Sequence, residues 1–245
     1  MSKKVLVLSG SPRKGGNSDT LCDQFIKGAI EAGHAAEKIY VGDYKIGFCK
    51  ACYACKKNGV CVQKDDMSVI LDKMVEADVI VMATPVYYYT MNGQMKTLID
   101  RALPRYYTEV KISGKDFYFI ATAAEKKETM ERTIDGLRGF TDCLPDATVK
   151  GVIYGAGAWQ LGDIQGNKAM QEAYDSGKNI QKPKGCFSIR AIYTIGHFMC
   201  IENGTDNGET NARALPAPAL MLAALIPLPN HLAVFFGYRI ARIDY

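Results

Sequence analysis

The apolar positions of the chain form short continuous runs that alternate with longer stretches of helical spacing. The stretch 18–33 places Leu21, Phe25 and Ala29 on one helical face, and the run VLVL before it ends at a glycine. Helical spacing predicts an amphipathic helix, whereas a short apolar run bounded by turn residues predicts a buried strand. We therefore predict five strands, at residues 3–10, 36–41, 78–85, 115–123 and 148–157. We also predict five helices, at residues 18–33, 66–77, 93–103, 129–144 and 167–180.

The regular alternation of strand and helix predicts an α/β fold. A doubly wound parallel sheet of five strands in the order 2-1-3-4-5 fits this alternation, with helices on both faces. In such a sheet a ligand binds at the carboxyl ends of the strands. The chemistry is therefore expected in the loops at residues 9–18, 84–93 and 123–128.

Residues 181–245 do not continue the alternation, so we predict a sheet domain at 1–180 and a C-terminal extension of unknown role at 181–245. The stretch 214–236 is apolar, but it contains four prolines and its longest proline-free run has eight residues. A membrane-spanning helix needs about 20 apolar residues, so no span is predicted. Packing on the domain or on a partner, a poorly ordered tail and a membrane contact stay open for this stretch.

The charge of the chain argues against nucleic acid as a partner. The net charge is +4, and Lys and Arg are balanced by Asp and Glu along most of the chain. The first residues, MSKKVLVLSGSP, contain too short an apolar stretch for an export signal. We therefore expect a cytoplasmic protein, in which cysteines stay reduced.

The first of the three loops has the composition of a phosphate-binding loop. Its sequence SGSPRKGGNS joins a strand to a helix, so backbone N–H groups and the helix N-terminus can face an anion. It is not a P-loop, because Gly16 stands where that motif needs lysine, and a G-x-G-x-x-G fingerprint is absent. The sequence favours a mononucleotide phosphate; a glycine and serine turn without a ligand is the alternative.

The second loop, ATPVYYYTMNGQMK, suits a flat aromatic ring. Backbone groups of Pro85 to Tyr88 can meet the polar edge of such a ring, and tyrosines can stack on it. Three consecutive tyrosines at a strand end cannot all be core residues, because strand side chains alternate. The alternative is a surface aromatic patch that serves only oligomer contacts.

These two loops, with KDDM between them, resemble the flavodoxin-like NAD(P)H-dependent FMN reductase family over residues 3–180. The resemblance implies a flavodoxin-like fold with FMN as cofactor and NAD(P)H as co-substrate. It also implies a homodimer or homotetramer. A third loop around Ala123 and Ala124 is expected near the flavin. The resemblance assigns the phosphate to Ser9, Ser11, Arg13, Asn17 and Ser18. It assigns the ring and ribityl chain to Thr84, Pro85, Val86, Tyr87, Tyr88, Asn92 and Gly93.

Four cysteines, Cys49, Cys52, Cys55 and Cys61, lie within thirteen residues in the spacing C-x2-C-x2-C-x5-C. Two-residue gaps suit a [4Fe–4S] cluster, whereas zinc more often uses two separated pairs. Nearby lysines would stabilise thiolates, which also fits redox-active thiols without metal. The spacing resembles the iron–sulfur flavoprotein branch of the reductase family. Cluster, free thiols and zinc all remain open.

The resemblance implies an FMN-dependent oxidoreductase that passes electrons from NAD(P)H via flavin to a quinone, an azo or nitro compound, or a similar small-molecule acceptor. No side-chain acid or base is expected, because the cofactor supplies the redox chemistry. The alternative is an iron–sulfur flavoprotein that acts as an electron-transfer protein fed by ferredoxin. A flavodoxin-like carrier and a non-flavin nucleotide-binding module are the other classes.

Overall fold

The computed structural model describes residues 2–181, 199–203 and 210–214 of the chain. The chain divides into two compact units, Met1–Gly185 and Cys186–Tyr245.

The first unit is built on a parallel sheet in the order β2-β1-β3-β5-β6. Its strands are β1 (Lys4–Ser9), β2 (Ala35–Tyr40), β3 (Val79–Tyr87), β5 (Asp116–Ala123) and β6 (Thr148–Ala156). This is the predicted order 2-1-3-4-5, because β5 and β6 are the fourth and fifth predicted strands. A further strand, β4 (Thr90–Met91), pairs antiparallel with the end of β3 and was not predicted. Two residues are too few to show a periodic pattern.

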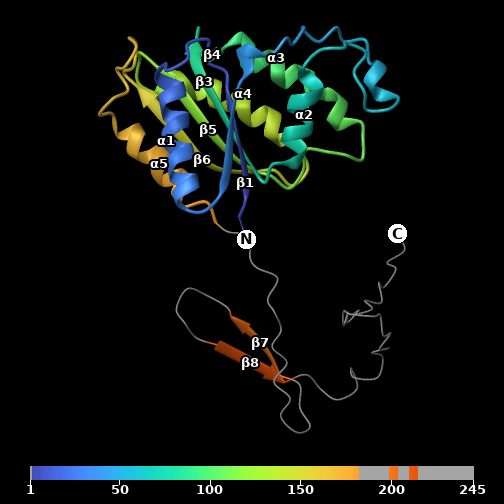
Figure 1. Ribbon diagram of the computed structural model, residues 1–245, viewed down its shortest axis with the longest axis vertical. Helices are drawn as coiled ribbons and strands as arrows, with labels where there is room; N and C mark the ends of the chain where they lie inside the picture. The colour runs from blue at the N-terminus through green and yellow to red at the C-terminus, as the bar shows by residue number, and fades with distance from the viewer. Residues whose placement is uncertain (1, 182–198, 204–209, 215–245) are drawn as a thin grey trace. The chain divides into compact units, whose positions relative to one another are not determined.

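Five helices cover the two faces of this sheet in the described part of the unit (Figure 1). They are α1 (Asn17–Glu31), α2 (Met67–Glu76), α3 (Gly93–Arg101), α4 (Glu131–Asp142) and α5 (Lys168–Lys178). Short 3-10 helices lie in the connections at η1 (Val41–Asp43), η2 (Ala54–Lys56), η3 (Leu103–Tyr106) and η4 (Lys127–Met130). The predicted helix 93–103 ends at Arg101, because the chain turns into η3, which contains Pro104.

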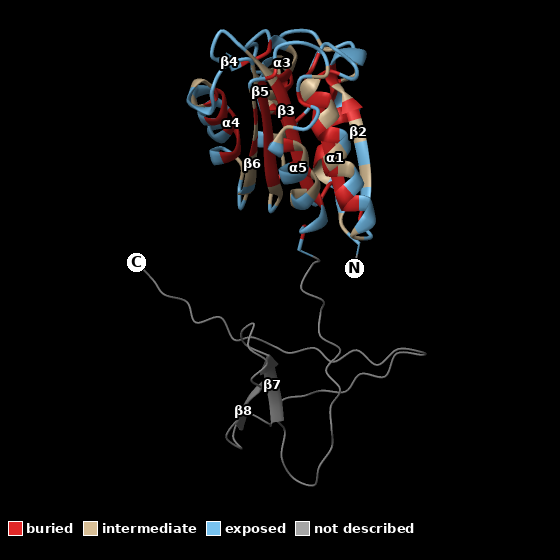
Figure 2. Cartoon of the chain, turned by 90° about the vertical axis from the view of Figure 1, so that its left-hand side faces the viewer, coloured by how far each residue is buried: buried red, intermediate tan, exposed pale blue. Residues whose placement is uncertain are grey.

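Two hydrophobic clusters, one on each face, hold the helices to the sheet. In β1, Val5 and Val7 pack with α1 and α5, whereas Leu6 and Leu8 pack with α2, α3 and α4. Successive strand residues point to opposite faces, so the continuous apolar runs of the sequence fill both clusters. Figure 2 shows the buried residues concentrated in the strands and on the helix faces toward them.

In the second unit, β7 (Met199–Asn203) and β8 (Thr210–Ala214) form an antiparallel pair, which the sequence did not predict. Residues 215–236 of the apolar stretch lie outside the described residues, so the three readings of that stretch stay predictions. None of the described helices is long and apolar enough to cross a membrane.

Candidate functional site

A hollow of about 450 Å³ lies at the carboxyl ends of the central strands. Four loops line it, one after each of β1, β3, β5 and β6. Pockets of this size hold small molecules and cofactors in other proteins. The hollow therefore lies where the sheet order predicts a ligand.

The first loop lines one end of the hollow with Ser11, Arg13, Asn17 and Ser18. The N-cap residue of α1, Gly16, forms no side-chain hydrogen bond, so the first backbone N–H groups of α1 remain available to a ligand. A side chain at Gly16 would put its Cβ 2.9 Å from the carbonyl oxygen of Arg13. This close approach of backbone to backbone explains the glycine and keeps the cradle open.

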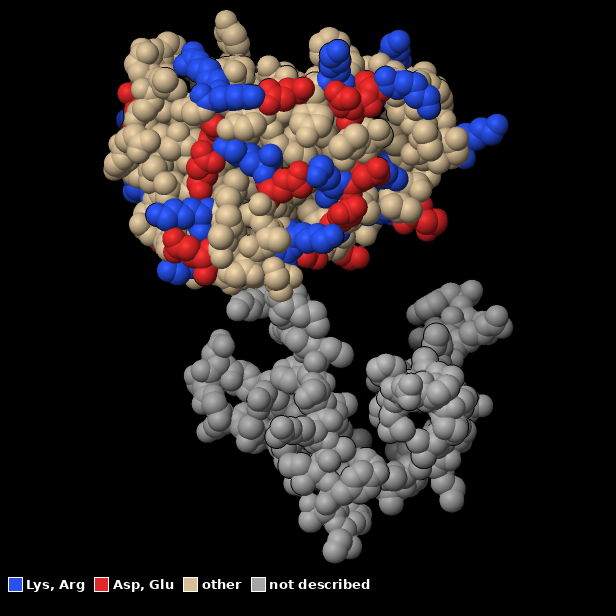
Figure 3. All heavy atoms as spheres, viewed as in Figure 1, with Lys and Arg blue, Asp and Glu red and all other residues tan. Residues whose placement is uncertain are grey.

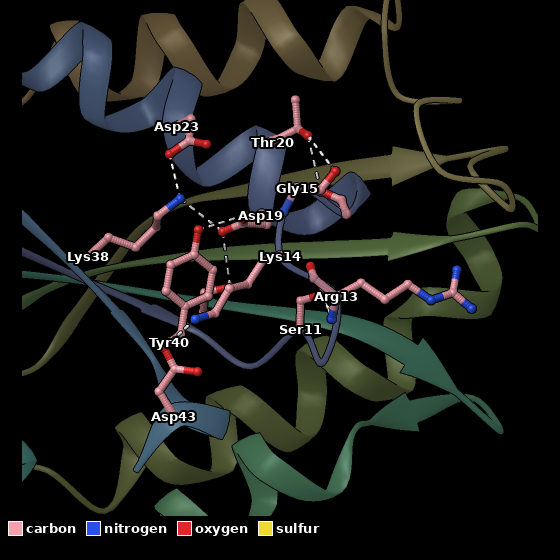
Figure 4. A network of polar contacts seen from close by, with 12 residues as sticks. Ser11, Arg13, Lys14, Gly15, Asp19, Thr20, Asp23, Lys38, Tyr40 and Asp43 are labelled. Atoms are coloured by element: carbon pink, nitrogen blue, oxygen red, sulfur yellow. Dashed lines mark hydrogen bonds and ion pairs between the residues drawn. The ribbon is translucent and has the colours of Figure 1, made fainter.

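Arg13 is the free cation of this loop. Its guanidinium forms no ion pair among the described residues, and it points away from the neighbouring polar network (Figure 4). The Ser11 hydroxyl donates to the Arg13 carbonyl at 3.0 Å and accepts from the Arg13 N–H at 3.1 Å. The serine therefore shapes the turn and leaves the arginine side chain free.

Asn17 and Ser9 hold the loop in place. The Asn17 amide donates to the Gln160 carbonyl at 2.8 Å, and its oxygen accepts from the N–H of Gly162 at 3.2 Å. Asn17 thus ties the first loop to the loop after β6. Ser9 is fully buried, does not line the hollow, and lies 3.4 Å from a carboxylate oxygen of Asp19.

Thr84 and Asn92 are buried and connect the second loop to the first. The Thr84 hydroxyl is 3.1 Å from the Asn92 side-chain oxygen and accepts from the Asn92 N–H at 3.1 Å. The Asn92 amide donates in turn to the Gly10 carbonyl. Neither residue lines the hollow, and Gly93 lies outside it at the start of α3. The assignment of these three residues to the ring and ribityl chain stays a prediction.

Pro85, Val86, Tyr87, Tyr88 and Tyr89 line the hollow. Tyr88 and Tyr89 form the two-residue turn between β3 and β4, with φ of 50° and 65°. Hairpin turns of this kind need positive φ at both positions and favour Asn-Gly there, since other residues are strained. Tyr88 is 99% exposed, so this strained turn holds an aromatic ring out into the solvent.

Two further loops complete the hollow. Ala123 and Ala124, which the sequence placed near the flavin, line it together with Thr122 and Glu125 after β5. The loop after β6 contributes Ala158 to Leu161, and sequence reasoning missed it. Trp159 of this loop is 71% exposed at the rim. The sequence did offer one signal for this loop. It directly follows the fifth predicted strand, and ligands bind at the carboxyl ends of the strands.

The four cysteines lie around a separate, small hollow of about 20 Å³ that shares no lining residue with the first. Cys55 is buried, Cys61 is half-buried, and Cys49 and Cys52 are exposed. Burial raises the pKa of the Cys55 thiol. Ala51 and Tyr53, between the cysteines, have φ of 49° and 54°. The loop is therefore sharply folded at both two-residue gaps.

Arg101 lines the cysteine hollow. Its guanidinium forms two hydrogen bonds to Asp65, at 2.6 and 2.8 Å, and donates to the Gly47 carbonyl at 2.6 Å and to Cys61 Sγ at 3.5 Å. The guanidinium lowers the pKa of Asp65 to about 2. The Arg101 guanidinium thus connects Gly47 and Asp65, which lie just before and just after the four cysteines, to the end of α3.

Residues 3–155 match the family model of the NADPH-dependent FMN reductases. The chain belongs to this family. An iron–sulfur flavoprotein of Archaeoglobus fulgidus is 35% identical over 167 residues, which cover 67% of this chain and 82% of that protein. A second one from the same organism is 41% identical over 101 residues, 41% of this chain and 46% of its own length. The chain thus spans about half of that relative, and the predicted family and branch are confirmed.

Solved structures confirm the flavodoxin-like fold of this FMN reductase. The NAD(P)H:quinone oxidoreductase of Methanothermobacter marburgensis has a TM-score of 0.59 at 17% identity, over 75% of this chain and 98% of that one. An azoreductase of Bacillus anthracis has a TM-score of 0.56 at 17% identity, over 73% and 99%. At such identities the likeness shows the fold alone.

Membership in the family makes the chain an FMN-dependent oxidoreductase. The larger hollow fits the cofactor, because it offers free N–H groups and a free arginine at one end and aromatic side chains at the other. The cysteine loop fits a cluster in residue type and spacing only. No group of three or more Cys, His, Asp or Glu side chains in the described residues is arranged to hold a metal ion.

Proposed function

We propose that this chain passes electrons from NAD(P)H through FMN to a planar small-molecule acceptor, such as a quinone, an azo compound or a nitro compound. The observation that carries this proposal is the aromatic rim of the larger hollow. Tyr88 and Trp159 stand exposed on the loops after β3 and β6, and both residues line the hollow. Exposed aromatic side chains on two loops of one hollow favour a flat acceptor that can stack on them.

The protein's own residues bind and orient the cofactor in this proposal. Arg13 and the N-terminal N–H groups of α1 hold the phosphate, since both favour an anion. Backbone groups of Pro85 to Tyr87 meet the polar edge of the ring. FMN, when bound, supplies the redox chemistry for which no amino-acid side chain is suited.

A steady-state assay tests the acceptor class. The FMN-loaded protein should oxidise NADH or NADPH with a benzoquinone or an azo dye as acceptor. Trp159→Ala should raise the KM for the acceptor several-fold, about the loss of one aromatic stacking contact, and leave the KM for NAD(P)H unchanged.

Tyr106→Ala is the matched control, because Tyr106 is a similarly exposed aromatic residue that does not line this hollow. No oxidation with any of these acceptors would contradict the proposal. An unchanged acceptor KM in Trp159→Ala would contradict the role of the aromatic rim.

The second candidate function is that of an iron–sulfur electron-transfer protein, fed by ferredoxin, with a [4Fe–4S] cluster in the cysteine loop. Its support is the cysteine spacing, the position of all four cysteines around one hollow, and the names of the relatives.

Iron and acid-labile sulfide, counted in protein purified without oxygen, test this second candidate. We expect about four irons per chain in the wild type and none in Cys55→Ser, while Cys143→Ser keeps the wild-type content. Cys143 is the control because it is exposed and outside the loop. Flavin without iron would leave the cysteines as thiols.

A further inference from the structure

A buried carboxylate lies beneath the first loop and has no part in the function described so far. Asp19, in the first turn of α1, is 1% exposed. It accepts hydrogen bonds from the Gly15 N–H at 2.8 Å, the Tyr40 hydroxyl at 2.9 Å and the Lys38 ammonium at 3.0 Å (Figure 4). The Ser9 hydroxyl lies 3.4 Å away. So many donors around one carboxylate indicate that it is charged in the folded protein.

Asp19 anchors the curve of the first loop. Gly15 has φ of 70°, and a Cβ there would meet nothing within 4 Å, so its backbone angle and not its surroundings requires glycine. The hydrogen bond from the Gly15 N–H to Asp19 holds this peptide just before the N-cap of α1. The shape of the predicted phosphate cradle therefore depends on a buried negative charge.

That charge is a disadvantage for an anion site. A phosphate in the cradle and the carboxylate below it repel one another, and the repulsion is weakly screened inside a protein. An uncompensated Asp19 would therefore lower the affinity of the loop for the very group that the loop is shaped to bind.

Lys38 compensates the charge from outside the loop. It lies on β2 beside Val7 of β1, and its side chain is only 14% exposed. Its ammonium pairs with Asp19 at 3.0 Å and with Asp23 at 2.5 Å, and it lies 4.7 Å from the centre of the Tyr40 ring. The Tyr40 hydroxyl donates to the same carboxylate, so β2 supplies both partners.

The other charged pair at this ring is exposed. Lys14 lies 5.0 Å from the centre of the Tyr40 ring on the loop side and pairs with Asp43 at 2.6 Å. Both side chains of this pair are about half exposed or more, so solvent screens them. Lys38 therefore remains the buried cation that faces Asp19.

We propose that Asp19 and Lys38 are positioning residues for the phosphate of FMN. Asp19 fixes the cradle through the Gly15 N–H, and Lys38 neutralises Asp19 so that its charge does not oppose the phosphate. The proposal rests on the assignment of the first loop as the phosphate site. Neither residue lines the hollow, so both act through the loop.

A comparison of FMN with riboflavin, which is the same flavin without the phosphate, isolates this effect. Binding of both is measured by flavin fluorescence on the apoprotein. Lys38→Met should weaken FMN binding at least about tenfold and leave riboflavin binding unchanged. Adding Asp19→Asn to Lys38→Met removes the uncompensated negative charge and should restore most of the FMN affinity.

Two control variants show whether the effect of Lys38→Met is specific to the phosphate. Arg13→Ala is the positive control, because loss of a direct phosphate contact should also weaken FMN selectively. Lys73→Met is the negative control, since it removes one positive charge and one ion pair to Glu37 of β2 without touching the loop. Lys38→Gln repeats the test if the methionine variant does not fold.

Equal losses for FMN and riboflavin in Lys38→Met would overturn the proposal, because they indicate a merely structural role. An unchanged FMN affinity would overturn it as well. A wild type that binds both flavins equally would refute the phosphate assignment itself, and the proposal with it. A wild type that prefers FMN, with variants that keep this preference, would overturn the proposal alone.

Discussion

At the scale of single residues, the shape of the cysteine loop depends on Arg101. The side chain is 2% exposed and is surrounded by Asp65, the Gly47 carbonyl and Cys61 Sγ. Its Nε has no partner among the residues that the structure describes. A lysine cannot replace this planar fork, because its ammonium offers donors from one point only.

The ion pair between Arg101 and Asp65 predicts how the free energy of unfolding depends on pH. Asp65 titrates at about 2 in the folded protein, below its ordinary value of 3.8, so the pair stabilises the fold fully above about pH 4. This contribution is lost as the pH falls from about 4 to 2. Asp65→Asn should therefore cost roughly 1–2 kcal/mol at pH 7, and this cost should shrink with acid.

Urea unfolding of the wild type and Asp65→Asn at several pH values measures this difference. Asp43→Asn is the control, because Asp43 belongs to an exposed ion pair that solvent screens. A difference between wild type and Asp65→Asn that stays constant down to pH 2 would contradict the prediction.

Asp65 stands directly before the predicted helix at 66–77, a position where an acidic side chain can cap a helix. In the structure Asp65 does accept from the Met67 N–H at 3.3 Å, but its shorter bonds go to Arg101, thirty-six residues further along. The local pattern of an acidic residue before a helix says nothing about so distant a partner. For the same reason the sequence could not show that Asn92 reaches back to Gly10.

At the scale of elements, α1 and α5 pack closely because glycines stand at their contact. A Cβ on Gly28 of α1 would lie 2.1 Å from the Tyr174 carbonyl oxygen, and one on Gly177 of α5 would lie 2.0 Å from that of Phe25. The close contact holds α1, and with it the end of the first loop. In the sequence these glycines give no positive signal, since glycine only weakens a helical pattern.

Gly28→Ala should therefore destabilise the fold by about 1–3 kcal/mol, because the added methyl group collides with backbone that cannot yield. Gly139→Ala in α4 is the matched control, since nothing lies within 4 Å of its Cβ. That substitution should stabilise by about 0.5–1 kcal/mol through helix propensity. Thermal unfolding measures both, and equal effects would show that the contact is loose.

The predicted elements were correct where a pattern extends over several residues. Runs such as VLVL gave the strands, and the strand order gave the end of the sheet that carries the hollow. The strand β4 and the loop at Trp159 escaped prediction for different reasons. The former is defined by pairing with β3, and the latter carries no motif that sets it apart.

At the scale of the whole molecule, the two signs of charge are nearly balanced, with 30 Lys and Arg against 26 Asp and Glu. Figure 3 shows Lys and Arg interspersed with Asp and Glu over one face of the first unit. A nucleic-acid surface would need a continuous basic patch, and this face offers none. The expected absence of a nucleic-acid partner stays a prediction, as do the cytoplasmic location and the homodimer or homotetramer.

Trp159 gives the molecule an optical property of its own. It is the one tryptophan of the 245 residues, and it stands at the rim of the hollow. Flavins absorb in the range where indole emits. A flavin bound in the hollow would therefore quench the tryptophan fluorescence of the protein, and dissociation of the flavin would restore this fluorescence. The intrinsic fluorescence of Trp159 should thus report the flavin content of the unlabelled protein continuously.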